Sequence, residues 1–533
     1  MGRRLLGVFV VVALACGPSA GGAPDSDPGD IDNDGDGYTV GDGDCRDDDP
    51  SIHPGLTEIC DDGIDNNCNG EVDTDYECLS PCEQAAVDRS SVGCIYYAVD
   101  TNPFHQTIPG DYAVVVSNVD PIALANVVVE VNDGAGWATV GGGTFTVPPL
   151  ALETLVLPHR FIAGSAVYAG GAYRITSDLP VIAYQFNPLD GSSSALSDAS
   201  LLLPVSAYDS FYIVPAWPFG PADNSPSSGH PAHIQIVAHE PTSVRVTSPI
   251  ATVAGAGVPA LLPNVLGSFD LQEGDYLQLT VQSFMDSFAG AYIESDRPVA
   301  LFSSNDCANV PAVGAAACCC EHLEEQVFGL QTWGTNYVGA QVPVRIAEGA
   351  IWQIMAQDDG TNVGFAPAPG VTGLPPSLTL SAREMVQYEV RGGAGVPGDF
   401  IISSDKPIHI TQYMVGARYA DSDGGNLGDP SMVQAIPVEQ YLTQYVVLVP
   451  GTWVNDYLVL VRQAGATVFL DGGPVMTGWT AVGAYEIARV PVADGVHVLD
   501  GSNPFGVTVV GYDQYDSYAY PGGLNQTVIN PVE

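Results

Sequence analysis

Two acidic loops near the start of the chain carry residue types at a spacing that binds a metal ion. In the first loop, Asp32, Asp34 and Asp36 occupy positions 1, 3 and 5, Gly37 occupies position 6, and the carbonyl of Tyr38 falls at position 7. Spacing of this kind wraps oxygen ligands around calcium in one tight turn, and glycine permits the bend. The loop therefore predicts a calcium site.

The rest of the ligand shell in this first loop must come from outside the EF-hand pattern. Position 12, where an EF-hand supplies a bidentate glutamate, is Gly43. We therefore expect the shell to be completed by Asp42, Asp44, Asp47 or water, with modest affinity.

A second loop repeats the same pattern about thirty residues later in the chain. Asp65, Asn67 and Asn69 stand at positions 1, 3 and 5, and Gly70 follows at position 6. Two further carboxylates that could serve as ligands follow it, namely Asp73 and Asp75. Two such loops make chance a poor explanation and predict a structural calcium module.

Calcium is the metal that this donor set favours. The only histidine of the segment is His53, and its cysteines are expected to be oxidised, so copper would lack the imidazole and sulfur donors that it prefers. Two alternatives remain open at this point. The segment could scavenge a metal at the surface, or it could be a disordered acidic spacer, because 19 acidic residues and one basic residue lie between Asp25 and Cys78.

The cysteines predict disulfides in an exported chain. Setting Cys16 aside, an even number remains. These disulfide candidates are Cys45, Cys60, Cys68, Cys78, Cys82, Cys94, Cys307, Cys318, Cys319 and Cys320. A zinc site made from Cys307, the Cys318–Cys320 triplet and His322 is the alternative, although zinc prefers spaced thiolates in a reducing compartment.

The beginning of the chain resembles an export signal. Two arginines precede the apolar stretch Leu5–Leu14, and a small residue then comes before Cys16. We expect residues 1–16 to be a lipoprotein signal and Cys16 to carry the lipid, with an ordinary signal peptide and a secreted protein as the alternative. The lipid would be the only membrane attachment, at the outer membrane or cell surface.

Charge excludes nucleic acid as an expected partner. The formal net charge is −47, and Lys406 is the only lysine among the 15 basic residues. Such a chain repels phosphate backbones and anionic lipid surfaces.

Beyond residue 94 the composition changes to strand-like runs that repeat. Ser-Asp-x-Pro occurs at residues 177, 295 and 404, each time inside an apolar run. We expect a strand, a turn capped by the aspartate and a second strand that begins at the proline. A second series begins at Ile95, Tyr212, Tyr337 and Tyr445, the fourth unit lacking the Ser-Asp-x-Pro turn.

These series predict an all-β region of four tandem units. The expected divisions are an acidic metal-binding segment at 17–78, a linker at 79–93 and a β-repeat region at 94–533, with units near 95–205, 206–325, 326–435 and 436–533. Seven or eight short strands per unit favour one β-sandwich each. Two four-stranded propeller blades per unit are the alternative.

The residues also resemble two known families. Five strings are similar to a Cys- and Asp-rich metal-binding motif of myxobacterial surface proteins, namely Asp34–Tyr38, Asp44–Pro50, Pro54–Gly55, Glu58–Gly63 and Asp65–Gly70. Gly93–Asp100, Ser303–Cys307, Cys318–Gln326 and Trp333–Tyr337 resemble the IgGFc-binding protein N-terminal domain family. This resemblance implies an adhesive surface role and supplies no catalytic residues; antibody binding does not follow from it.

We therefore expect a binding protein rather than an enzyme, whose partner is an unknown surface or extracellular protein or glycan. His230, His233 and His239 do not form a metalloprotease pattern. A secreted hydrolase acting on polysaccharide or protein remains the alternative, and it would need carboxylates gathered from distant loops. Aromatic residues such as Trp217 and the run Tyr512–Tyr520 are the places where a ligand face is expected.

Overall fold

The computed structural model describes residues 31–532 apart from residues 75, 103–109, 135, 190–195, 219, 222–228, 284, 313–319, 394–395 and 422–424. The chain divides into two compact units, Met1–Ser80 and Pro81–Glu533. Cys16, Asp75, Cys318 and Cys319 lie outside the described residues. Within the described part, no helix has both the length and the apolar character needed to span a membrane.

The first unit is a small module of turns with two short 3-10 helices, η1 (Val40–Asp42) and η2 (Tyr76–Cys78). Ile52 is the single fully buried apolar side chain among its described residues. Two disulfides, Cys45–Cys68 and Cys60–Cys78, cross-link the turns. Covalent links thus replace the core that so short and acidic a segment cannot build, and they argue against a disordered spacer.

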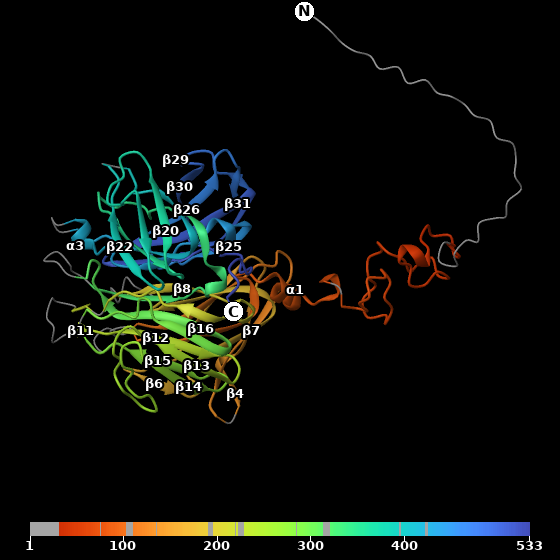
Figure 1. The fold of residues 1–533 in the computed structure, drawn as a ribbon, viewed down its shortest axis with the longest axis horizontal. Coiled ribbons are helices and arrows are strands. Elements are labelled where there is room, and N and C mark those ends of the chain that lie inside the picture. The colour runs from red at the N-terminus through yellow and green to blue at the C-terminus, as the bar shows by residue number, and fades with distance from the viewer. Residues whose placement is uncertain are drawn as a thin grey trace, which may run out of the picture. The chain divides into compact units, whose positions relative to one another are not determined.

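The second unit is almost entirely β and contains four curled sheets of seven or eight strands (Figure 1). Sequence reasoning predicted this fold class, and the sheets confirm it. A propeller of four-stranded blades does not fit, because each repeat forms one larger sheet. The third and fourth sheets, cyan to blue, lie together on one side of this unit, and the first two lie on the other (Figure 1).

The first two sheets are built around the long strands β7 and β16. The first sheet has the order β4-β3-β7-β2-β5, and β1 and β8 also pair with β7. Its strands are β1 (Gly93–Ala98), β2 (Tyr112–Asn118), β3 (Ala125–Asn132), β4 (Trp137–Val147), β5 (Leu152–Leu157), β7 (Tyr173–Asn187) and β8 (Asp198–Leu202). The second has the order β14-β13-β16-β12-β15-β6, with β9 and β17 also on β16. Its strands are β6 (Ala166–Tyr168), β9 (Asp209–Ile213), β12 (Ala232–Ala238), β13 (Thr242–Thr247), β14 (Leu266–Leu271), β15 (Tyr276–Thr280), β16 (Tyr292–Ala308) and β17 (Glu321–Gln326).

The third and fourth sheets repeat this plan around β23 and β31. The third has the order β21-β20-β23-β19-β22, with β18 and β24 on β23. Its strands are β18 (Gly334–Gly339), β19 (Ala350–Ala356), β20 (Thr361–Pro367), β21 (Ser377–Leu380), β22 (Met385–Val390), β23 (Phe400–Tyr413) and β24 (Met432–Gln434). The fourth has the order β28-β27-β31-β26-β30-β29, with β25 and β32 on β31. Its strands are β25 (Leu442–Val449), β26 (Asn455–Gln463), β27 (Val468–Leu470), β28 (Gly473–Pro474), β29 (Thr480–Val482), β30 (Tyr485–Pro491), β31 (Gly495–Asp513) and β32 (Asp516–Pro521).

Short elements complete the second unit. They are α1 (Pro81–Asp88), η3 (Val205–Ala207), η4 (Leu330–Thr332), α3 (Ala417–Ala420), η5 (Val438–Gln440) and the hairpin of β10 (Gly220–Pro221) with β11 (Gly229–His230). Residues 79–93, expected as a linker, contain α1, which contacts β1 and β7 and is joined to β1 by the Cys82–Cys94 disulfide. The missed signal is the cysteine pair twelve residues apart, which fastens the helix to the sheet.

The Ser-Asp-x-Pro signatures lie inside single long strands, and the expected division into two strands is wrong. The pairing of each long strand with the strand that opens its repeat skips four residues, at 177–180, 295–298, 404–407 and 501–504. The proline therefore lies in a bulge. No hydrogen bond between the two strands needs an N–H at this position, so proline is tolerated there. The fourth repeat has the same bulge at Gly501–Pro504, although it lacks the signature.

The bulge aspartates do not cap their own turns. Asp178 accepts hydrogen bonds from the backbone and side-chain nitrogens of Asn126 on β3, at 2.7 Å each. Asp405 does the same with Asn362 on β20, at 2.8 and 2.7 Å. Each aspartate thus ties the bulge to the neighbouring strand.

In each repeat, one buried tyrosine is hydrogen-bonded to the backbone of the bulge. Tyr96, Tyr212, Tyr337 and Tyr445 each donate a hydrogen bond to the carbonyl of the residue that follows the bulge proline, and all four are buried. The Tyr212 and Tyr337 bonds measure 2.6 Å. These tyrosines belong to the series that was read from the sequence as the start of each unit.

The first and fourth repeats pack against each other and share an apolar core. Buried residues of the first and fourth sheets, such as Tyr184 and Tyr520, whose ring centroids lie 4.8 Å apart, belong to one apolar cluster. Next to it, the Ser91 N–H donates to the carbonyl of Leu524 at 3.1 Å, and the Gln526 N–H donates to the carbonyl of Arg89 at 2.6 Å. The segment after β32 therefore pairs with the segment before β1.

Candidate functional site

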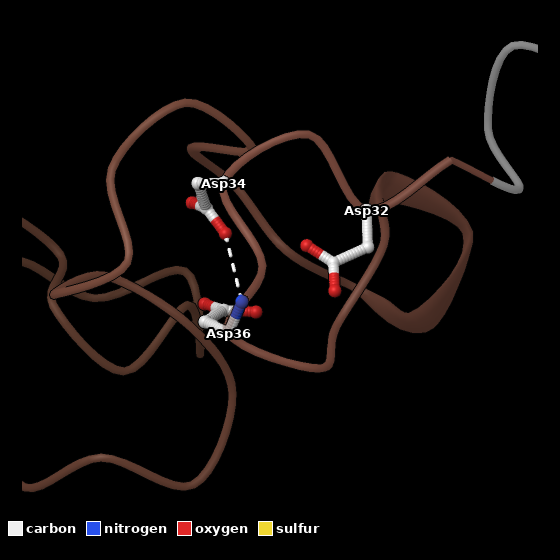
Figure 2. Close-up of side chains that lie close together, drawn as sticks. All are labelled: Asp32, Asp34 and Asp36. Atoms are coloured by element: carbon white, nitrogen blue, oxygen red, sulfur yellow. Dashed lines mark hydrogen bonds between the residues drawn. The ribbon is translucent and has the colours of Figure 1, made fainter.

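The first acidic loop gathers its three aspartates as the spacing predicts. One carboxylate oxygen from each of Asp32, Asp34 and Asp36 lies within 4.8 Å of the other two (Figure 2). Asp32 accepts hydrogen bonds from the N–H groups of Gly35 and Gly37, at 2.6 and 3.1 Å, which folds the loop back over its first residue. Both glycines have φ near +90°, a backbone region that glycine tolerates best.

The oxygens that face the loop interior fit a hard cation. Asp34 Oδ2, Asp36 Oδ2 and Asp44 Oδ2 are shielded from solvent and make no hydrogen bond with a described residue. Burial raises the pKa of Asp34, and the charges of Asp36, Asp44 and Asp32 raise it further, although the N–H of Asp36 opposes the rise. Asp44, one of the residues expected to complete the ligand shell, therefore lies near enough to Asp34 for its charge to act on that carboxyl.

Asp42 and Asp47, which were also expected to complete the ligand shell of the first loop, have different neighbours. Asp42 lies in η1, where its side chain accepts a hydrogen bond from the hydroxyl of Thr39 at 2.8 Å. Asp47 accepts from the backbone and side-chain nitrogens of Asn33, at 3.0 and 2.5 Å. Neither belongs to the group of close carboxylates, and both support the loop around it.

The second loop has the same backbone scaffold. Asp65 accepts hydrogen bonds from the N–H groups of Asn69 and Gly70, at 3.1 and 2.9 Å, and Asn69 Oδ1 accepts from the N–H of Glu71 at 2.8 Å. Asn67 Oδ1 also accepts from the N–H of Asn69, at 3.0 Å. Two amides replace the carboxylates at positions 3 and 5, so this loop offers less negative charge to a cation than the first.

A glutamate that sequence reasoning missed organises the second loop. Glu58 is buried, and its Oε2 accepts hydrogen bonds from the N–H groups of Asn66 and Asn67 at 3.1 and 3.2 Å. Asp73, which was expected as a ligand, binds the N–H groups of Asp62 and Gly63 at 3.1 and 2.9 Å. The signal for Glu58 was its place two residues before Cys60, inside the Cys- and Asp-rich motif.

The sulfur atoms and the imidazole of the described module are engaged in disulfides and in ring stacking. The four module cysteines form the two disulfides, and the ring of His53 stacks on Tyr38 with centroids 4.8 Å apart. In the β region, Cys307 is bonded to Cys320, so the expected clamp on the intervening loop is confirmed for this pair. An oxidised Cys307 cannot serve as a thiolate ligand, which removes the zinc alternative built on it.

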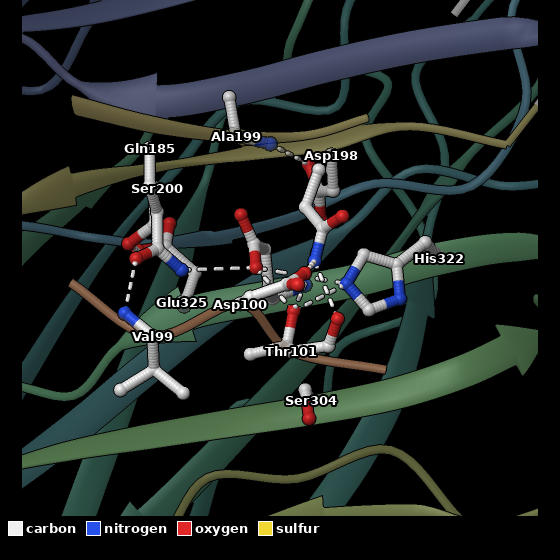
Figure 3. Close-up of polar contacts among 12 residues, drawn as sticks. Val99, Asp100, Thr101, Gln185, Asp198, Ala199, Ser200, Ser304, His322 and Glu325 are labelled. Carbon is white, nitrogen blue, oxygen red and sulfur yellow. Dashed lines mark hydrogen bonds and ion pairs between the residues drawn. The ribbon is translucent and has the colours of Figure 1, made fainter. Parts of the chain in front are cut away.

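A second gathering of polar groups lies inside the β region (Figure 3). Thr101 Oγ1 donates to Glu324 Oε2 at 2.5 Å and lies 2.8 Å from His322 Nε2. The side-chain amide of Gln185 donates to the same Glu324 oxygen at 3.0 Å, and Asn187 donates to Thr101 Oγ1 at 2.9 Å. All of these side chains are buried. Burial raises the pKa of Glu324 and lowers the pKa of His322 to about 4, so the imidazole is neutral at physiological pH.

Histidines and aromatic residues singled out in the sequence are engaged in the interior. His233 lies between Asp306 and Thr280, at 2.7 and 2.9 Å, whereas His239 lies beside Tyr208, so the two do not converge on a metal. Trp217 is only 3% exposed and Tyr518 is fully buried, which corrects the expected aromatic ligand face. These rings fill the spaces between sheets, where large side chains bury the most apolar area.

Comparison with known proteins finds a matching family model for each of the two units of the chain. A family model described as "IgGFc binding protein" matches residues 198–511, and one described as "Putative metal-binding motif" matches residues 44–74, after the first loop. The IgGFc-binding protein of Homo sapiens is 26% identical over 312 residues, which are 55% of this chain and only 5% of that relative. No solved structure matches the chain. With more than half of its residues inside the first of these matches, the chain belongs to the IgGFc-binding protein family.

Proposed function

We propose that this chain is a lipid-anchored adhesion protein of the cell surface, in which the acidic module folds on calcium and the β repeats bind an extracellular protein or glycan. Binding as the general role is supported by the family. The human relative is named for binding the Fc part of IgG, and this chain spans a small part of it. The ligand proposed here is therefore the broader class of extracellular proteins and glycans, and antibody is not singled out.

Calcium in the module is supported by one observation above all: Asp32, Asp34 and Asp36 lie close together, and one oxygen each of Asp34 and Asp36 is buried without a hydrogen-bond partner among the described residues. The donors are all oxygen, which suits calcium and offers nothing to a soft metal. Among the described residues of the module Ile52 is the single fully buried apolar side chain, so binding energy from an ion would contribute to its folding directly. Asp44 is the fourth ligand proposed for this loop, and Asp65, Asn67 and Asn69 are proposed for the second.

Export is supported by the four disulfides, which form and persist in oxidising compartments. Attachment through a lipid on Cys16 rests on the sequence alone. Mass spectrometry of the chain recovered from a bacterial membrane fraction tests it: a diacylglyceryl group on Cys16 supports anchoring, and an unmodified chain cleaved near Ala20 contradicts it.

A hydrolase finds no support in the described part of the β region. The group of Thr101, His322 and Glu324 has the residue types of a catalytic site, but their side chains are fully buried and hydrogen-bonded to one another. A reacting atom could not reach them without opening the sheet junction. The arrangement is that of an internal polar network, whose hydrogen bonds join side chains of the first and second repeats.

Calorimetric titration of the mature chain with calcium tests the proposed module. The parent should bind calcium, and a variant with Asp32, Asp34 and Asp36 changed to alanine should lose the tighter site. Asp48→Ala is the matched control, because Asp48 is an exposed carboxylate of the same module outside the close group. Equal calcium binding by the triple variant and by Asp48→Ala would overturn the assignment.

A further inference from the structure

One threonine hydroxyl inside the β region is surrounded by groups that can activate it as a nucleophile. Thr101 follows β1 and is fully buried. Its Oγ1 lies 2.8 Å from Nε2 of His322 (Figure 3) and 2.5 Å from Oε2 of Glu324. The hydroxyl proton therefore has two acceptors within hydrogen-bond distance. A hydroxyl beside a base is the arrangement by which serine and threonine become nucleophiles.

His322 is in the state that a base requires. Its side chain is fully buried, and burial lowers the pKa of the imidazole to about 4. The ring is therefore neutral at physiological pH, and a neutral ring nitrogen can take up a proton. Burial raises the pKa of Glu324, so this carboxyl holds its own proton more readily and is the weaker base of the two.

A side-chain amide lies against the same hydroxyl. Asn187 is the last residue of β7 and is fully buried. Its Nδ2 lies 2.9 Å from Thr101 Oγ1, and it also donates to the backbone carbonyl of Thr101 at 2.5 Å. The amide carbon is one bond of about 1.33 Å beyond this nitrogen, so the hydroxyl oxygen lies at most about 4.2 Å from it. Oδ1 of Asn187 makes no hydrogen bond with a described residue.

Both of these groups belong to the chain, so no substrate has to enter the buried site. Burial argues against a hydrolase, because an outside molecule cannot reach the hydroxyl. It does not hinder a reaction between two side chains that are already in contact. Holding two reacting groups together lowers the barrier to their reaction, and exclusion of water protects the product from hydrolysis.

We propose that Thr101 and Asn187 form an ester cross-link inside the β region. Oγ1 of Thr101 attacks the amide carbon of Asn187, and Nε2 of His322 takes the hydroxyl proton. The bond between this carbon and Nδ2 then breaks, and the proton passes from His322 to the leaving nitrogen, which departs as ammonia. One hydroxyl and one amide thus become one ester and one ammonia, without an oxidant, a reductant or an added acyl donor.

The ester joins two segments that are 86 residues apart. It connects the residues after β1 to the end of β7, the strand with which β1 pairs. β1 is the first strand of the β region, so the bond keeps it attached to the first sheet when the chain is pulled from its N-terminal side. Formation of the bond depends neither on the proposed calcium sites nor on the proposed ligand.

The mass of the full mature chain tests this proposal. The protein is reduced, alkylated and denatured in acid before the intact mass is measured. We expect a mass about 17 Da below that of the sequence, because one ammonia is lost when an amide becomes an ester. Proteolysis and tandem mass spectrometry should find the peptides of Thr101 and Asn187 joined, and hydroxylamine, which cleaves esters and spares amides, should separate them.

Thr101→Val and His322→Gln remove the nucleophile and the base, and each should have the full mass of its sequence. Thr280→Val is the matched control. Thr280 is also buried, with Oγ1 2.9 Å from Nδ1 of His233, but among the described residues no side-chain amide is hydrogen-bonded to this hydroxyl. Thr280→Val should therefore keep the loss of one ammonia and the joined peptides.

Three results overturn the proposal. The first is a parent chain with the full mass of its sequence, which decides the matter whether or not the variants fold. The second is a loss of ammonia that persists in Thr101→Val, because a cyclised asparagine elsewhere in the chain then explains it. The third is a link from Thr101 to Gln185 or Glu324, since both lie in the same network and either would show that Asn187 is not the acyl group.

Discussion

At the scale of single residues, the four buried tyrosines bear most directly on stability. Tyr337 donates to the carbonyl of Ile408 at 2.6 Å and accepts from the N–H of Gly334 at 3.2 Å. Tyr337→Phe leaves both backbone groups buried without a partner. We expect a loss of roughly 1 to 3 kcal/mol in the free energy of unfolding, measured by urea denaturation. Tyr388→Phe is the control, because its half-buried hydroxyl makes no hydrogen bond with a described residue; equal effects of the two would refute the role assigned to Tyr337.

Asp456 predicts a pH dependence. Burial raises the pKa of this carboxyl to about 6, although the hydroxyl of Tyr518 donates to it at 2.7 Å and partly opposes the rise. The folded-state pKa lies above the unfolded value of about 3.9, so its stabilising contribution is present below about pH 4 and is lost as pH rises through about 6.

Asp456→Asn keeps an acceptor for Tyr518 and removes the ionisation. The variant should gain Tm relative to the parent between pH 6 and pH 8 and show no gain near pH 4. Asp358→Asn, at an exposed position, should leave the profile unchanged. A constant difference across the pH range would contradict the assigned pKa.

At the scale of elements, the bulge aspartates are expected to differ according to their partners. Asp178 and Asp405 each bind a backbone and a side-chain nitrogen of an asparagine, whereas Asp296 is exposed and forms an ion pair with the guanidinium of Arg245, at 2.8 Å. Surface ion pairs contribute little. Asp178→Ala and Asp405→Ala should therefore lower the urea midpoint more than Asp296→Ala, and the reverse order would show that the strand link is unimportant.

Strand positions were predictable because runs of β-branched and aromatic residues mark them. β2 and β12 are buried at every residue, whereas burial alternates along β13 and β14. The bulges were harder to predict. A serine, an aspartate and a proline together indicate a turn, and only the pairing of neighbouring strands shows that one strand continues through it. The helix at Pro81–Asp88 was missed because Ala85 is its single fully buried residue, which leaves no apolar stripe to read.

Candidate site residues could be predicted where the residues of one site lie close together in the sequence. Asp32, Asp34 and Asp36 lie on one turn, so spacing alone places them together. Glu321 and Asp516 lie in different repeats, and only the packing of the sheets buries both of them. In sequence they look like ordinary polar residues at strand ends.

At the scale of the whole β region, stability should depend on closure between the first and fourth sheets. Leu524 is fully buried, and its backbone pairs with Ser91. Leu524→Ala should cost about 2 to 5 kcal/mol and increase hydrogen exchange in β1 and β25. Val528→Ala, which is 43% exposed, should change neither. Faster exchange confined to the segment after β32 would contradict closure.

The central claim is that calcium folds the acidic module, and hydrogen–deuterium exchange of the full chain with and without calcium tests it most directly. Gly35, Gly37, Asn69 and Gly70 donate the N–H groups that shape the two loops. The account predicts strong protection of residues 31–80 on adding calcium, abolished around the first loop by the Asp32, Asp34 and Asp36 to alanine changes. Exchange in residues 31–80 that is the same with calcium and with chelator would contradict it.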